Sequence, residues 1–200
     1  NFVVSDLPQD LNRYADANFL QVSHPLKGLQ RLAEKYRAGF DVPVIGVTGS
    51  NGKTIVKEWI YQLLAPERII TRSPRSYNSQ IGVPLSVWLM NERTELGVFE
   101  AGISEMGEME ALQSIIRPTV GILTNIGGAH QENFYSVQDK CMEKLTLFKE
   151  CDVVIYDADN EMISSCVSKS LFGAREIAWS RKDPERPLYI EWVRKGEKET

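Results

Sequence analysis

Short apolar runs alternate with amphipathic segments along most of this chain. From residue 42 onward the runs predict strands, and the segments between them repeat apolar residues at spacings of three and four, which predicts helices. Such alternation is typical of an α/β fold, a mostly parallel sheet with helices on both faces. The expected strands span 43–48, 68–71, 96–101, 120–125, 152–156, 176–179 and 188–193, and the expected helices span 54–64, 84–91, 107–117, 136–149 and 160–170.

The first 40 residues follow a different pattern. An apolar run at 2–4 and a short strand at 18–22 precede a helix that starts near Pro25 and ends at Gly39. Proline suits the first turn of a helix, and glycine commonly ends one. The chain begins without Met and stops shortly after an apolar run, so we expect both ends to be cut from a longer protein.

Composition argues against several classes of protein. The net charge of −4 disfavours a general binder of nucleic acid or of anionic membranes. No apolar run approaches the length of a membrane span, and no signal peptide opens the chain. Cys141, Cys151 and Cys166 are odd in number and lack metal-binding spacing, so we expect reduced thiols in a cytoplasmic protein.

The segment from Val44 to Thr54 carries the most specific chemical signal. A short apolar strand runs into Gly-Ser-Asn-Gly-Lys-Thr, and a helical pattern follows at once. In this context backbone amides at a helix N-terminus wrap a polyphosphate, Lys53 reaches the phosphates, and the Thr54 hydroxyl ligates Mg²⁺. The strict motif has glycine where Val47 stands, so the loop is a variant; the alternative is a plain strand-to-helix turn with a solvated lysine. The expected nucleotide-binding residues are Gly49, Ser50, Asn51, Gly52, Lys53 and Thr54.

Two further candidates directly follow apolar strands. Ligands of such sheets lie beyond the carboxyl ends of the strands, so side chains at these positions are expected to gather there. Glu100 ends the strand at 96–101 and can hold Mg²⁺ directly or through water, although a solvated loop acid is the alternative. His130 follows the strand at 120–125, where a neutral imidazole can ligate a metal or serve a structural role.

Lys144 occupies an unusual position in the helix expected at 136–149. On a helical wheel it projects into the middle of the apolar arc, whereas Lys140 lies nearer the edge. A lysine there either snorkels to solvent or is desolvated with a depressed pKa. A neutral amine of the second kind can react or be covalently modified. The apolar arc consists of Val137, Cys141, Leu145 and Phe148.

Taken together, these motifs resemble the Mur ligase family in their order and spacing. The resemblance covers about residues 42–180 and implies that 41–200 is the central ATP-binding domain. It also implies that 1–40 is the end of the family's N-terminal uridine-nucleotide-binding domain, and that the family's C-terminal domain is absent from these 200 residues. The motifs are the P-loop at 46–54, Asn78-Ser79-Gln80-Ile81-Gly82-Val83-Pro84, Glu100-Ala101-Gly102, Thr124-Asn125-Ile126-Gly127-Gly128-Ala129-His130, and Lys144.

The resemblance implies an ATP-dependent amide ligase of peptidoglycan precursor synthesis, acting in the cytoplasm. Its Glu-x-Gly and Ile-Gly-Val-Pro elements favour the member that joins D-alanyl-D-alanine to a UDP-N-acetylmuramoyl tripeptide through an acyl phosphate. By the resemblance, Lys53, His130 and Lys144 are catalytic. One Mg²⁺ is held by Thr54 and Glu100, and a second by His130 and a carbamylated Lys144. Asn125 contacts the nucleotide, and Asn78 lies near the substrate.

Some positions depart from the family pattern, and other functions stay open. Relatives often show Asn-His where Ser104-Glu105 stand, and Glu where Thr146 stands. The alternatives are another Mur-type ligase, a folylpolyglutamate-type ligase, a P-loop kinase or regulatory NTPase, and a nucleotide-binding module without catalysis. We expect the 200 residues alone to bind Mg-ATP weakly and not to turn over.

Overall fold

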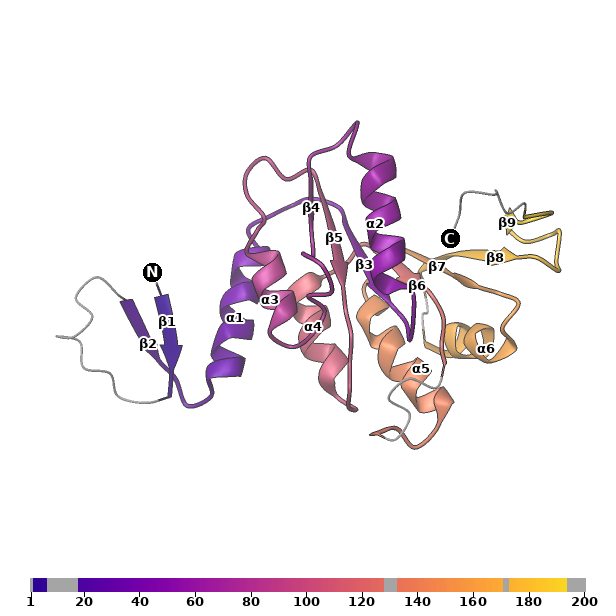
Figure 1. Ribbon diagram of the computed structural model, residues 1–200. Helices are drawn as coiled ribbons and strands as arrows, with labels where there is room; N and C mark the ends of the chain where they lie inside the picture. The colour runs from indigo at the N-terminus through magenta and orange to yellow at the C-terminus, as the bar shows by residue number, and fades with distance from the viewer. Residues whose placement is uncertain (1, 7–17, 128–132, 171–172, 194–200) are drawn as a thin grey trace.

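A parallel sheet of seven strands forms the centre of the molecule (Figure 1). The computed structural model describes residues 2–6, 18–127, 133–170 and 173–193. The strand order is β4-β5-β3-β6-β7-β8-β9, and each neighbouring pair runs parallel. The predicted α/β fold is therefore confirmed. The strands are β3 Val44–Thr48, β4 Ile70–Arg72, β5 Leu96–Glu100, β6 Val120–Leu123, β7 Val153–Asp157, β8 Arg175–Ser180 and β9 Leu188–Tyr189.

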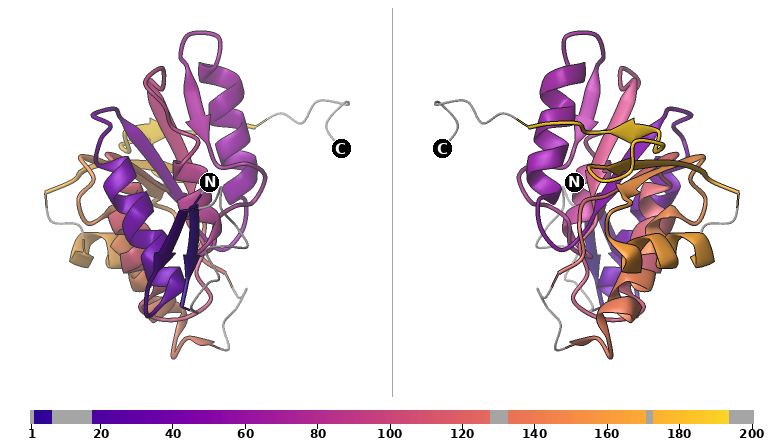
Figure 2. Two further views of the ribbon diagram at one scale, coloured as in Figure 1. Left: turned by 90° about the vertical axis from the view of Figure 1, so that its left-hand side faces the viewer. Right: turned by 90° about the vertical axis from the view of Figure 1, so that its right-hand side faces the viewer.

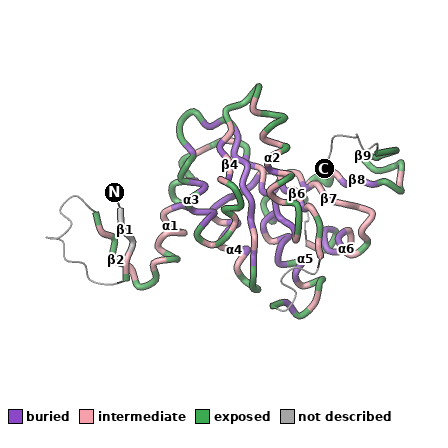
Figure 3. Tube along the Cα trace, viewed as in Figure 1, coloured by how far each residue is buried: buried purple, intermediate pink, exposed green. Residues whose placement is uncertain are grey.

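Helices cover both faces of this sheet, but unequally (Figures 1 and 2). Most helices contribute to a single large core on one face, whereas α2 covers the other face through Val56 and Ile60. Burial follows the same division, with the buried residues concentrated in the sheet and in the helices on the larger side (Figure 3). The helices are α1 Pro25–Arg37, α2 Lys53–Leu64, α3 Gly82–Val87, α4 Glu108–Ile116, α5 Val137–Leu145 with the 3-10 turn η3 Thr146–Phe148, and α6 Glu161–Ser170.

The apolar pattern predicted the helices better than it predicted which residues they bury. On α2 the side chains of Ile55, Trp59 and Leu63 are 56%, 62% and 77% exposed, because this stripe faces away from the sheet. On α5, Val137 was expected in the buried arc but is also exposed. The strand expected at 188–193 is correct only at its first two residues.

A separate pair of parallel strands precedes α1. It consists of β1 Phe2–Ser5 and β2 Asn18–Gln21, and it lies at the far left of Figure 1. The helix that follows packs against α3 and α4, where Ala33 enters the main core. The domain boundary at residue 40 stays a prediction. Within the described residues, no helix combines the length and the apolar character that a membrane crossing requires.

Arg37 joins α1 to the end of α4. Its guanidinium is buried and donates hydrogen bonds to three backbone carbonyls, at 3.0 Å to Ile116, 2.7 Å to Phe40 and 3.4 Å to Arg117. The last carbonyls of a helix have no intrahelical donors, so a cation there is favourable for both hydrogen bonding and the helix dipole. This contact therefore fixes α1 against the sheet domain.

We expect Arg37→Met to lower the free energy of unfolding by about 2–4 kcal/mol, because it leaves buried carbonyls without donors. Arg31→Met is the matched control, since Arg31 is an exposed arginine of the same helix, and its change should stay within about 0.5 kcal/mol. Urea unfolding of both variants measures the difference. Equal stabilities would show that Arg37 does not anchor the helix.

Candidate functional site

The turn between β3 and α2 holds two glycines in backbone conformations that other residues rarely adopt. Gly49 has a φ of +143° and Gly52 a φ of +80°. A Cβ atom on Gly49 would lie only 2.0 Å from the Thr124 hydroxyl oxygen. Glycine at both positions lets the backbone turn from the strand into the helix and present the first amides of α2, which have no intrahelical acceptor.

Asn125 secures this turn to the segment that follows β6. Its backbone carbonyl accepts from Ser50 N at 2.8 Å, and its side-chain oxygen accepts from Asn51 N at 3.0 Å. Thr124 adds a hydroxyl donor to the Asn51 carbonyl at 2.6 Å. Asn125 therefore supports the turn directly, and its contact with a nucleotide stays a prediction.

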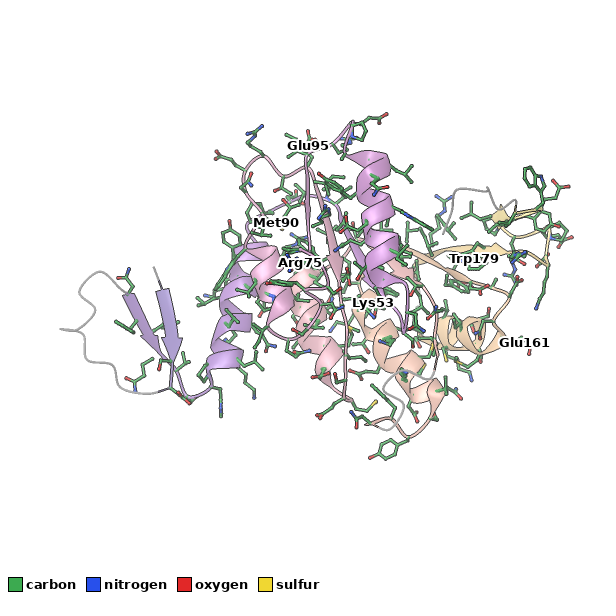
Figure 4. All side chains as sticks on the ribbon, viewed as in Figure 1. Lys53, Arg75, Met90, Glu95, Glu161 and Trp179 are labelled. Carbon is green, nitrogen blue, oxygen red and sulfur yellow. The ribbon has the colours of Figure 1, made fainter. Side chains whose placement is uncertain are left out.

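Three lysines surround one small cavity beside the turn. The cavity has a volume of about 180 Å³ and is lined by residues that include Lys53, Lys140 and Lys144. Lys53, at the N-terminal end of α2 (Figure 4), donates to the Gly49 carbonyl at 2.9 Å. Burial lowers its pKa, the charge of Glu100 partly offsets this effect, and the nearby Lys140 lowers the pKa further. The cavity therefore concentrates positive charge at the N-terminus of a helix, an arrangement suited to an anion.

Lys144 is buried in this cavity, as one of the two sequence interpretations required. Its exposed fraction is 3%, so it does not snorkel. Burial, followed by the charges of Lys53 and Lys140, lowers its pKa to about 7. Lys140, expected nearer the edge of the apolar arc, is equally buried and donates to the Gly127 carbonyl at 2.6 Å. Near neutral pH, a substantial share of Lys144 is therefore an uncharged amine.

Glu100 is fully buried at the end of β5 and faces Thr54. Its Oε2 atom accepts from the Thr54 hydroxyl at 3.1 Å and from the Asn78 side-chain amide at 3.2 Å. A hydroxyl and a carboxylate side by side are hard oxygen ligands, so this pair fits Mg²⁺. The other nearby acids lie elsewhere: Glu108 accepts from the backbone of Ser104 and Glu105, and Glu110 pairs with Lys149 at 2.8 Å.

Gly102 explains the spacing of the Glu-Ala-Gly motif. Its amide donates to the Asn78 carbonyl at 2.8 Å, and a Cβ at this position would lie 3.0 Å from the Asn78 side-chain oxygen. A larger residue would therefore push Asn78 away from Glu100. The glycine permits the close approach that places Asn78 beside the carboxylate.

Sequence reasoning missed one charged residue of the site and named one that the structure does not describe. Lys57 is completely buried, with its ammonium 3.0 Å from Glu100 Oε1. The signal available in the sequence was its position four residues after Lys53, which places both on one side of α2.

His130 lies outside the described residues, and its metal role stays a prediction. Among the described residues, no cluster of three His, Cys, Asp or Glu side chains could hold a metal.

This geometry first defines a class of protein. A glycine-rich strand-to-helix turn with its lysine, beside a Thr–Glu oxygen pair at the carboxyl ends of a parallel sheet, is the arrangement of a P-loop nucleotide-binding domain. Residues 47–191 match the family model of the Mur ligase middle domain. The chain therefore belongs to the Mur ligase family, as the sequence motifs indicated.

Individual relatives agree with the family assignment. The chain is similar to the UDP-N-acetylmuramoyl-tripeptide–D-alanyl-D-alanine ligase of Bacillus subtilis (strain 168), with 36% identity over 150 residues that cover 74% of this chain and 33% of the relative. For the ligase of the same name from Borreliella burgdorferi the identity is 37% over 150 residues, with coverages of 74% and 32%. The crystal structure of MurF ligase from Thermotoga maritima in complex with ADP has a TM-score of 0.78 at 26% identity, covering 90% of this chain and 41% of that chain. The chain thus spans about one third of the length of the curated relatives it matches.

We expect Lys144→Met to stabilise the fold at pH 7 by about 2–5 kcal/mol in bicarbonate-free buffer, because burial of the lysine is unfavourable. The pKa of Lys144 is lower in the folded protein, about 7, than its ordinary value of 10.5. Between these two values the unfolded chain binds more protons, so wild-type stability rises with pH and the advantage of the variant shrinks. Urea unfolding at pH 7 and pH 9 measures this change. A pH-independent difference would contradict the buried, destabilising lysine.

Proposed function

We propose that the protein containing this chain is an ATP-dependent amide ligase of peptidoglycan precursor synthesis. It adds D-alanyl-D-alanine to a UDP-N-acetylmuramoyl tripeptide. The observation that carries the proposal is the meeting of the P-loop lysine, the Thr54–Glu100 pair and the buried Lys144 at one end of the sheet. The names of the two relatives described above support the choice of substrates.

The first chemical step requires concentrated positive charge. The terminal carboxylate of the peptide attacks the γ-phosphorus of ATP, giving an acyl phosphate and ADP, so two negatively charged groups must approach each other. Lys53 neutralises the phosphates, exchanging its present acceptor, the Gly49 carbonyl, for phosphate oxygens. The amine of D-alanyl-D-alanine then attacks the acyl carbon, forming the amide and releasing phosphate.

Thr54 and Glu100 are the residues that would hold Mg²⁺ with the nucleotide. The ion supplies charge neutralisation at the phosphate oxygens when it is bound. Asn78 donates to Glu100 Oε2 and so helps to direct the carboxylate toward Thr54, while its place near the substrate stays part of the proposal. A second ion would be held by His130 and a modified Lys144.

The surroundings of Lys144 support its proposed carbamylation. An uncharged amine adds to CO₂ through a new N–C bond and loses a proton, which gives an anionic carbamate. Among the described residues that line the cavity there are three lysines and no carboxylate, so an anion there gains two cationic neighbours. The adjacent Glu143 is committed elsewhere, because it accepts from Gly107 N at 2.9 Å and from Met109 N at 3.0 Å at the start of α4. The modified side chain would have the oxygen ligands that Mg²⁺ prefers.

The remaining substrates need parts of the protein beyond this domain. We place the UDP-linked peptide against the N-terminal domain of which residues 1–40 are the end, and the incoming dipeptide against a further C-terminal domain of the same chain. ATP and nucleotide-linked precursors are cytoplasmic substrates, so the reaction belongs to the cytoplasm.

The complete protein should convert UDP-N-acetylmuramoyl tripeptide, D-alanyl-D-alanine and ATP into amide product, ADP and phosphate in equal amounts. Lys53→Ala should abolish both product and positional isotope exchange in ATP, because acyl phosphate no longer forms. Mass spectrometry detects the amide, and ³¹P NMR follows the exchange. ADP release that does not depend on either peptide substrate would indicate an NTPase instead.

Lys144→Ala in the complete protein should lower the ligation rate by about 10²–10³-fold, since the metal ligand is lost. Short carboxylic acids added to the assay should restore part of the rate, because the truncated side chain leaves room for a carboxylate. Lys149→Ala is the control, as Lys149 is a more exposed lysine paired with Glu110. A near-normal rate for Lys144→Ala would show that Lys144 has no role at the metal site.

A further inference from the structure

Lys57 of α2, the helix that follows the glycine-rich turn, is completely buried, and the proposed reaction gives it no role. The side chain of Lys57 has an exposed fraction of 0%, and its ammonium lies 3.0 Å from both Glu100 Oε1 and Glu58 Oε1. It also donates to the Ser73 carbonyl at 2.7 Å and to the Arg75 carbonyl. Burial of an ammonium group is unfavourable unless its partners are well placed. A lysine with this many partners is therefore held in one position.

The two carboxylate oxygens of Glu100 face different partners. Oε1 faces the ammonium and accepts no hydrogen bond from a described residue, so the ion pair is its compensation. Oε2 faces the Thr54 hydroxyl and the Asn78 amide. The ion pair therefore holds the carboxylate in the rotation that leaves one particular oxygen toward Thr54.

The same ammonium fixes the loop that carries Asn78. Its two backbone acceptors belong to the segment after β4, where Arg75 (Figure 4) has a φ of +49°. In this segment the Ser73 hydroxyl accepts from Glu100 N at 3.1 Å, and the Ser76 hydroxyl lies 3.1 Å from that of Thr54. One cation thus connects α2, the end of β5 and the loop after β4.

We propose that Lys57 is a positioning residue of the magnesium–nucleotide site, acting through Glu100 and the loop that carries Asn78. The inference rests on the proposed function, because it takes Thr54 and Glu100 as the residues that hold the ion. Lys57 presents Glu100 Oε2 to the ion and keeps Oε1 occupied.

If Lys57 only balanced the charge of Glu100, its removal would have the opposite effect on metal binding. Its positive charge lies close to the site and repels a divalent cation, so its removal alone would tighten metal binding. A positioning lysine instead weakens metal binding when it is removed, because Glu100 is free to rotate. The direction of the change therefore distinguishes the two roles.

The test compares nucleotide affinity with and without a metal in the complete protein. We expect Lys57→Met to raise the Kd for ADP in the presence of Mn²⁺ by about tenfold. The Kd for ADP without divalent metal should change by less than about twofold, since the turn and Lys53 are intact. Glu58→Gln is the matched control: it removes the outer, partly exposed partner of Lys57 and should leave both values nearly unchanged. Isothermal titration calorimetry measures both constants.

A double-mutant cycle shows whether Lys57 acts through Glu100. In a Glu100→Gln background, Lys57→Met should have no further effect on the metal-dependent affinity. If Lys57→Met does not fold, Lys57→Gln replaces it, because glutamine keeps a donor for the Ser73 carbonyl. The same two results are then expected: weaker metal-dependent binding alone, and no further effect in the Glu100→Gln background. Unchanged or tighter Mn²⁺-dependent binding in a folded variant would overturn the inference. If the wild-type protein shows no metal-dependent nucleotide binding, it is the proposed function that fails.

Discussion

The pairing of β3 with β5 on one side and β6 on the other is the constraint on which the site depends. In the parallel register Val47 lies opposite Glu100, and Thr48 lies opposite Leu123. The three strands therefore end together, and the segments that leave them must share one small volume. That is why Ser50 contacts Asn125, and Thr54 contacts Glu100, although each pair is distant in sequence. Catalytic groups of parallel α/β proteins collect at this edge for the same geometric reason.

Charge balance at this edge is the second organising feature. Lys57 pairs with Glu100 and Glu58, and both Lys53 and Lys140 donate to backbone carbonyls. Carbonyl oxygens satisfy the hydrogen bonds of an ammonium but carry no full charge. The cavity beside the turn therefore keeps an excess of positive charge, visible in the lowered pKa values of Lys53 and Lys144. A polyphosphate and a carbamate are the kinds of group that would remove this excess.

The sequence predicted those features that depend on neighbouring residues. The alternation of strands and helices and the glycine-rich turn are local patterns, so both were found correctly. Lys144 was found because a charged residue interrupts a local apolar arc. Lys57 was missed because a charged position on a helix is normally solvated, and its partners Ser73 and Glu100 lie far along the chain. The exposed stripe of Ile55, Trp59 and Leu63 shows the converse limit: periodicity finds an apolar face but not what covers it.

Departures from ordinary folding preferences mark the site independently of any motif. Lysines are rarely fully buried, and yet several lie within one small region of this domain. Positive φ values at Gly49, Gly52 and Arg75 occur in the same region, in the two segments that Lys53 and Lys57 contact. A sequence selected for stability alone would replace such lysines by apolar residues of similar volume. Their presence at one edge of the sheet is explained by ligands of opposite charge, and this explanation connects the fold's least favourable interactions with the proposed step in which phosphate and carboxylate meet.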